Sequence, residues 1–167
     1  MNNGLKLAGQ FLVEKLQEEL REQGHHATGE LINSINYRIE GDVLIIQTPK
    51  AYASAMENGL PKGHAVPIGA LIRWIEVKGI ATGDKEIRSA AWAIRAAIIR
   101  EGSPTTGEYG APSAFAYTKN GRRTGFVEVV INEHAKKALI LIEKELGKEI
   151  QAIISNEVKK INNGDNG

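Results

Sequence analysis

The chain has 167 residues, which fits one domain with its own hydrophobic core, and 42% of the residues are hydrophobic. It contains no cysteine, which excludes disulfides and thiolate metal sites, and its apolar runs are too short to predict a membrane-spanning helix. The net charge of +1 is unevenly spread, because residues 58–127 carry a balance of +5 between flanks of −3 and −1, which is typical either of a surface that faces a polyanion or of charges that pair between segments or subunits.

The first part of the chain predicts a helix followed by a β-hairpin. Apolar residues at spacings of three and four predict an amphipathic helix from residue 5 to about residue 23. Thr28 is expected to cap a short helical turn. Two strands are predicted at 35–39 and 43–48, joined by a short turn that contains Gly41, and the second should be the more buried because it is a continuous apolar run.

The middle of the chain predicts three more helices and a long loop. A short helix over residues 51–58 should end at Gly59, and two further helices are predicted at about 68–77 and 84–100. Residues 102–125 contain five glycines and two prolines and show almost no periodicity. A loop of this length within a compact domain is usually functional or disordered.

The C-terminal part predicts one long helix. Residues 126–131 are apolar and β-branched, so they indicate either a third strand or the start of that helix, which should run from 133 to about 161. Strands and helices without βαβ alternation indicate an α+β fold. We therefore expect a single α+β domain over residues 1–161 with a long flexible loop at about 103–125, and a disordered tail at 162–167.

The sequence offers few candidates for catalysis or for cofactor binding. No nucleotide-binding glycine motif and no G-x-S-x-G nucleophile motif occurs. His25 and His26 are adjacent, but they have no third metal ligand at helical spacing, and solvated loop histidines explain them equally simply. Glu57 is an acid within an apolar stretch, which suits a general acid or base or a structural hydrogen-bonding role. We expect no enzyme activity and no cofactor or metal.

Basic and aromatic residues suggest two possible contact surfaces. Arg88, Trp92 and Arg95 recur at helical spacing, which suits phosphate contact or arginines lying beside a buried tryptophan. The long loop and its end carry a second set, which suits docking on another protein or on nucleic acid. This set is Tyr109, Phe115, Tyr117, Lys119, Arg122 and Arg123.

Two short tracts flank the predicted hairpin. The first is Thr28-Gly29-x-Leu31-x-x-Ser34-Ile35, and the second is Tyr52-Ala53-x-x-x-Glu57-x-Gly59. Their order and spacing resemble the family of tailed-phage neck and tail-completion proteins, which are minor structural proteins that join head to tail. A looser similarity extends the match to about residues 5–102. In this chain the Pro112–Phe115 segment lies inside an extended basic loop and the closing helix is long, so the subgroup is left open.

The resemblance implies a structural virion protein that acts as a subunit of a homo-oligomeric ring around the DNA channel. Its partners would be further copies of itself and the neighbouring head-side and tail-side phage proteins, with possible non-specific contact to channel DNA. It would be assembled in the host cytoplasm and reside in the neck or tail of the virion. The 103–125 loop would contact a neighbouring subunit or an adjacent ring. The alternative is a small nucleic-acid-binding protein that uses the basic helix face and the loop.

Overall fold

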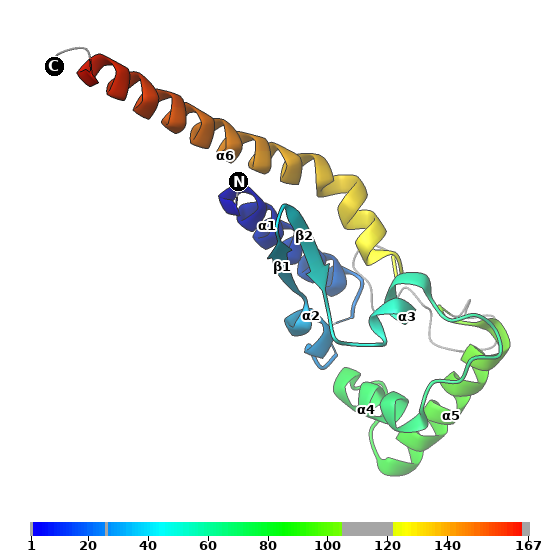
Figure 1. Cartoon of the computed structure of the whole chain (residues 1–167). Coiled ribbons are helices and arrows are strands. Elements are labelled where there is room, and N and C mark those ends of the chain that lie inside the picture. Colours follow the sequence, from blue (N-terminus) through cyan, green and yellow to red (C-terminus); the bar gives the residue numbers. More distant parts are fainter. Residues whose placement is uncertain (1, 26, 105–121, 165–167) are drawn as a thin grey trace.

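The structure, a computed structural model, describes residues 2–25, 27–104 and 122–164. Over these residues the chain has an α+β fold with one two-stranded antiparallel sheet, as predicted (Figure 1). The elements in chain order are α1 (Asn2–Glu22), α2 (Glu30–Ser34), β1 (Asn36–Glu40), β2 (Val43–Gln47), α3 (Ala53–Asn58), α4 (Ile68–Lys78), α5 (Asp84–Glu101) and α6 (Phe126–Gly164).

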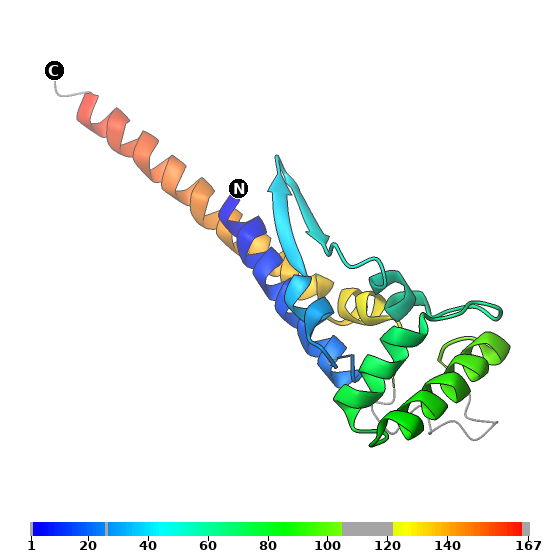
Figure 2. The same ribbon diagram turned by 90° about the horizontal axis from the view of Figure 1, so that it is seen from below.

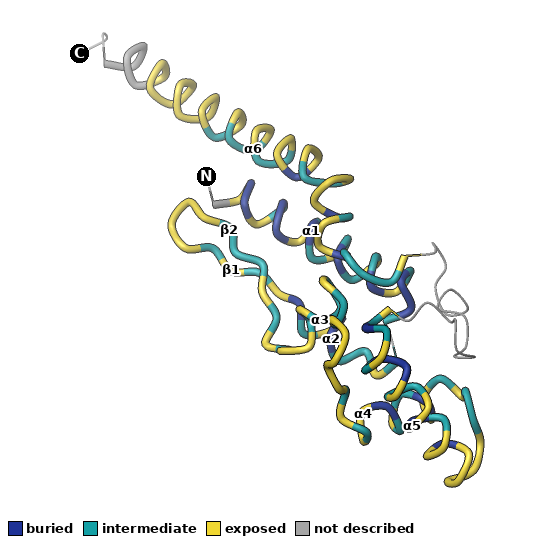
Figure 3. The backbone as a smooth tube through the Cα atoms, turned by 90° about the vertical axis from the view of Figure 1, so that its right-hand side faces the viewer, coloured by how far each residue is buried: buried dark blue, intermediate teal, exposed yellow. Residues whose placement is uncertain are grey.

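The larger hydrophobic core surrounds α1, which packs against α6 and against the β-hairpin (Figures 1 and 3). Four buried residues of α1 recur every four positions, so a single stripe of the helix faces the core. Gly9 lets the hairpin approach α1 closely, because a Cβ there would lie 2.6 Å from the Tyr37 ring. The buried members of this core are Ala8, Leu12, Leu16, Leu20, Leu31, Ile32, Ile35, Phe126, Val130 and Ala138.

The hairpin has a continuous register from Asn36 opposite Gln47 to Glu40 opposite Val43. Gly41 makes the turn possible with φ of 60°, a left-handed conformation that glycine adopts without steric cost. β2 has three partly buried side chains where β1 has two, so β2 is the more covered strand, as its apolar run predicts.

A second, smaller core lies between α4 and α5. These helices form a pair near the end of the molecule opposite to the C-terminus (Figure 2). The chain enters and leaves the pair at one point, where Leu60 and Ser103 form an antiparallel bridge. The buried members of this core are Leu71, Ile75, Ile87, Ala91 and Ile98.

The segment 126–131 begins α6 and is not a third strand. α6 continues to Gly164, past the predicted end near residue 161, so the first residues of the predicted disordered tail are helical. The remainder of that predicted tail, 165–167, lies outside the described residues. The first half of α6 packs on α1, and the second half projects past the N-terminus of α1 (Figure 1).

Candidate functional site

The two tracts that flank the hairpin lie together in the structure. The Tyr52 hydroxyl lies close to the backbone at Leu31, which brings the start of α3 beside α2. The Ser34 hydroxyl lies 2.7 Å from the hydroxyl of Thr48, so the residues just before and just after the hairpin also meet. The hairpin thus returns the chain to its starting point and joins the two tracts into one site.

Charged side chains reinforce this junction. The Lys50 ammonium donates to the Glu30 carboxylate at 2.9 Å, and Arg73 of α4 lies 3.5 Å from the same carboxylate. The hydrogen bond from Lys50 lowers the pKa of Glu30, and that carboxylate in turn raises the pKa of Lys50. Burial, followed by the Glu30 charge, raises the pKa of Tyr52 because both disfavour the phenolate.

The first tract forms a turn that starts α2. Gly29, with φ of 70°, precedes the helix, so the prediction that Thr28 caps it directly is wrong. Thr28 lies one residue earlier, and its hydroxyl accepts from the Glu30 N–H at a long 3.4 Å. Leu31 and Ile35 are buried, and the Ser34 hydroxyl donates to the Leu31 carbonyl at 2.8 Å. The tract therefore contributes to folding through burial and backbone hydrogen bonds.

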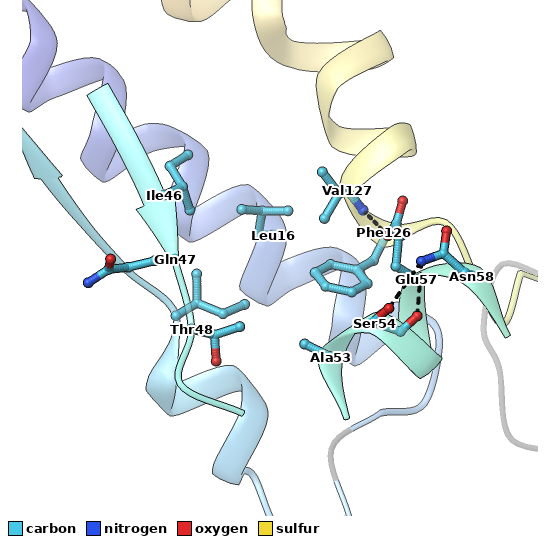
Figure 4. A pocket seen from close by; sticks show the side chains of 11 residues that line it. Leu16, Ile46, Gln47, Thr48, Ala53, Ser54, Glu57, Asn58, Phe126 and Val127 are labelled. Carbon is cyan, nitrogen blue, oxygen red and sulfur yellow. Dashed lines mark hydrogen bonds between the residues drawn. The ribbon is translucent and has the colours of Figure 1, made fainter. Parts of the chain in front are cut away.

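In the second tract, Glu57 caps the long helix α6. Its carboxylate accepts from the N–H group of Val127 at 2.7 Å (Figure 4) and from that of Glu128 at 3.1 Å. The residue before the helix is Gly125, which has no side chain to accept these bonds, and its own N–H donates to the Glu57 carbonyl at 2.8 Å. The negative charge also complements the positive end of the helix dipole. Of the two roles that the sequence left open for Glu57, the structure supplies the hydrogen-bonding one.

Ala53 and Gly59 complete the second tract. Ala53 is partly buried and packs against the larger core at the start of α3. Gly59 ends α3 with φ of 73°, and a Cβ there would overlap the Ser103 carbonyl oxygen. A Cβ at Gly102 would likewise overlap the Leu60 carbonyl oxygen. Gly59 and Gly102 therefore allow the segment that enters the α4–α5 pair and the segment that leaves it to pass close to each other.

A shallow apolar groove of about 270 Å³ opens beside the joined tracts (Figure 4). Leu16, Ile46 and Phe126 supply its apolar floor, and Ser54, Glu57 and Asn58 of α3 form one side. The Asn58 amide donates to the Ser54 carbonyl at 3.2 Å. The polar groups named here are already hydrogen-bonded within the protein, so the groove suits burial of a small apolar group from a partner.

The basic residues at the end of the long loop turn toward α1. Arg122 lies 3.1 Å from Glu133 and 4.0 Å from Glu19, so it bridges α6 and α1. Arg123 is partly buried, burial lowers the pKa of its guanidinium, and its carbonyl oxygen lies 2.9 Å from the His25 ring nitrogen Nε2. These two predicted contact residues therefore help to hold the loop end on the body of the protein.

Arg88 and Trp92 are exposed one turn apart on α5, and the partly buried Arg95 follows Trp92 by three residues. The Arg95 guanidinium stacks over the Trp92 ring at 5.4 Å and donates through Nε to the Val66 carbonyl at 3.2 Å. Trp92 is 57% exposed, so the alternative of arginines beside a buried tryptophan is wrong. Arg88 is exposed on the same side of the helix. Exposed tryptophan beside arginine is typical of binding surfaces.

The other predicted contact residues, Tyr109, Phe115, Tyr117 and Lys119, lie outside the described residues, as does His26. Within residues 2–25, 27–104 and 122–164, no three histidine or acidic side chains are placed to hold a metal ion. No helix of the described chain is both long enough and apolar enough to cross a membrane.

Two features of the site could not be read from the sequence. Glu57 and its partners Val127 and Glu128 are about 70 positions apart, and no local pattern connects them. The contact of Gly59 with Ser103 likewise depends on the path of the chain through the α4–α5 pair. The sequence did show Glu57 as an isolated acid in an apolar helix that ends at Gly59. That pattern indicated a structural role for Glu57 but could not show which groups it would contact.

Comparison with known proteins found no matching family model, no matching curated protein and no matching solved structure.

Proposed function

We propose that this chain is a non-enzymatic structural protein that joins the head of a tailed phage to its tail. In this role it is a subunit of a neck or tail-completion ring around the DNA channel, assembled in the host cytoplasm and retained in the virion. The proposal rests on the resemblance of the two tracts, in their order around the hairpin, to the neck and tail-completion family.

The observation that carries the proposal is the joining of the two tracts into one scaffold. Tyr52 contacts the backbone at Leu31, and Glu57 caps α6, so the residues of the resemblance fix the position of the longest helix. Each polar group in the tracts that has been described serves the fold. The two tracts therefore serve the folding of the subunit, as expected for a structural protein that contacts its neighbours through other surfaces.

The direct test is a nonsense mutation in the gene within its phage. We expect infected cells to accumulate filled heads and separate tails in electron micrographs of the lysate, and a plasmid copy of the gene should restore joined particles. Mass spectrometry of purified virions should detect the protein. Fully joined, infectious particles formed without the gene product would contradict the proposal.

The long loop offers a second test of the same function. We expect a chain that lacks residues 105–122 to fold, because the members of both cores found among the described residues lie outside this segment, and yet to fail to restore joining. Circular dichroism and thermal unfolding would establish that the shortened chain folds. Normal joining by this folded variant would show that the loop makes no necessary contact.

A second candidate function is nucleic-acid binding through the α5 surface. The observation that favours it is the exposed Arg88 beside Trp92, with Lys85 one turn earlier and also exposed. Binding by phosphate contacts should weaken steeply between about 50 and 200 mM salt. Titration of duplex DNA with the wild-type chain and with Arg88→Glu tests this candidate, which fails if the two chains bind equally or if binding does not respond to salt.

A further inference from the structure

The projecting half of α6 has no cover from the part of the chain that the structure describes. α1 begins at Asn2, and the Asn3 amide donates to the Glu145 carboxylate at 2.7 Å, which marks where the two helices part. From residue 147 to Gly164 the helix continues for about 27 Å, and every side chain from Ile150 to Lys159 is exposed. An isolated helix of this length is marginally stable in water.

Four aliphatic side chains lie on one side of this projecting segment, and we call them the α6 stripe: Ile150, Ile153, Ile154 and Val158. Ile153 is 64% exposed and Ile154 is 57% exposed. Spacings of three and four place the residues of the stripe on one face of the helix. Glu157 lies on the same face, seven residues after Ile150. Aliphatic side chains exposed together in this way are typical of an interaction site.

The opposite end of the molecule carries a face of complementary character. The side of α5 away from α4 exposes a set that we call the α5 outer face: Lys85, Arg88, Trp92, Ala93 and Ala96. α5 buries Ile87, Ala91 and Ile98 against α4, so this outer face has no cover from the smaller core. Its alanines leave room beside the tryptophan for the side chains of another helix.

The charges of these two surfaces are opposite. On α6, Glu157 lies on the face of the stripe because it follows Ile150 by seven residues, while Lys148 and Lys159 lie on the opposite side of the helix. On α5, Lys85 and Arg88 lie beside Trp92 at the centre of the outer face, and Asp84 and Glu86 lie at its two edges. The centre of each face therefore combines one sign of charge with apolar side chains. Opposite charges of this kind favour the correct pairing and disfavour the pairing of each surface with itself.

We infer that the α6 stripe of one copy of this chain packs on the α5 outer face of a second copy. α5 and the projecting part of α6 lie at opposite ends of the described molecule, as both views show, so the α5 outer face of a chain does not reach the stripe of the same chain (Figures 1 and 2). Contact between two different surfaces is heterologous, and repetition of such a contact closes a ring or extends a filament. The inference rests on the proposed function, for which it supplies the contact between neighbouring subunits.

Two variants at exposed positions test the two surfaces one at a time and leave both hydrophobic cores unchanged. Ile153→Lys with Ile154→Lys places two positive charges in the α6 stripe, and Trp92→Glu places a negative charge on the α5 outer face. The matched control, Ala152→Lys with Asn156→Lys, adds the same charges to the opposite face of the same exposed helix. Circular dichroism of each variant establishes that it folds.

Sedimentation velocity over a concentration series, up to about 1 mM, measures self-association. We expect the wild-type chain and the control to associate, and each surface variant to associate about 30-fold more weakly or worse. A 1:1 mixture of the two surface variants should form a heterodimer and nothing larger, because the mixture contains one intact pair of surfaces.

Several results would overturn the inference. A wild-type chain that is monomeric throughout has no such contact. Association that survives Trp92→Glu and is lost only with the stripe variant indicates pairing of stripe with stripe. A Trp92→Glu chain that still associates but loses DNA binding assigns the α5 outer face to nucleic acid.

The same variants distinguish this inference from the proposed function. If phage particles join normally with a monomeric stripe variant, the inference fails and the proposed function stands. If the variants behave as expected in solution but the gene is unnecessary for joined particles, the contact stands and the proposed function fails.

Discussion

The two halves of α6 differ in what covers them, although they belong to one helix. The first half is capped by Glu57 and buries Phe126, Val130 and Ala138 against α1. The second half, after Glu149, has only exposed side chains up to Lys159 and still carries four aliphatic ones (Figure 3). The first half therefore contributes to the folding of the monomer, whereas the second half leaves its aliphatic side chains exposed to solvent.

The largest effect should follow from a change in the packed half. Phe126→Ala removes a buried ring in the larger core and should lower the free energy of unfolding by about 3–5 kcal/mol. Ile153→Ala in the projecting half should change it by less than about 0.5 kcal/mol for the monomer. Urea unfolding of both variants at low protein concentration measures the contrast. Equal losses would show that the projecting half is packed in the monomer after all.

A smaller effect is expected where α3 ends before the chain enters the α4–α5 pair. Gly59→Ala places a Cβ at an unfavourable positive φ and against the Ser103 carbonyl oxygen. It should lower the free energy of unfolding by about 3 kcal/mol. Gly63→Ala is the matched control, because Gly63 also has positive φ but open space around it, and it should cost about 1–2 kcal/mol. Thermal unfolding measures both variants, and equal losses would mean that the close crossing adds nothing.

The cap on α6 should contribute less again. Glu57→Ala removes both acceptors from the first turn of α6 and should cost about 1–2 kcal/mol. Glu57→Gln keeps one acceptor oxygen but removes the charge, so it should lower the free energy of unfolding by only part of that amount. Glu14→Gln, an exposed substitution on α1, serves as the control. Denaturant unfolding would contradict the capping role if Glu57→Ala resembled this control.

The smallest effect concerns acid sensitivity at the junction of the tracts. The pKa of Glu30 is lowered in the folded protein by Lys50, so its contribution to stability is present above its unfolded pKa and is lost as the pH falls through the folded value. Glu30→Gln should therefore lower stability slightly at pH 7, and by progressively less as the pH falls through the folded pKa of Glu30. Thermal unfolding across this pH range tests the sign, and a loss that grows in acid would contradict it.

Most of the secondary structure could be predicted from local sequence patterns. The apolar spacing from Leu5 to Leu20 and the Gly41 turn depend on neighbouring residues, and the helix and the hairpin appear where those patterns lie. The start of α6 was ambiguous, because Phe126 and its β-branched neighbours suit a strand as well as a helix. The cap from Glu57 resolves that ambiguity, and it comes from a distant part of the chain.

The candidate site was less predictable for the same physical reason. The sequence pointed to Glu57 and Gly59 but could not show that one caps α6 and the other lies against Ser103. Trp92 was expected to be buried as one of two alternatives, since tryptophan at helical spacing usually packs in a core. In the structure the core side of α5 is filled by Ile87, Ala91 and Ile98, which leaves Trp92 exposed.

Native mass spectrometry of the 167-residue chain is the most direct test of the proposed contact, because it counts the copies in each complex. We predict that the wild-type chain forms a series of oligomers ending in one closed species with a fixed number of subunits. Ile153→Lys with Ile154→Lys should remain a folded monomer. Identical mass distributions for the two chains, whether monomeric or oligomeric, would show that the projecting half of α6 does not mediate assembly.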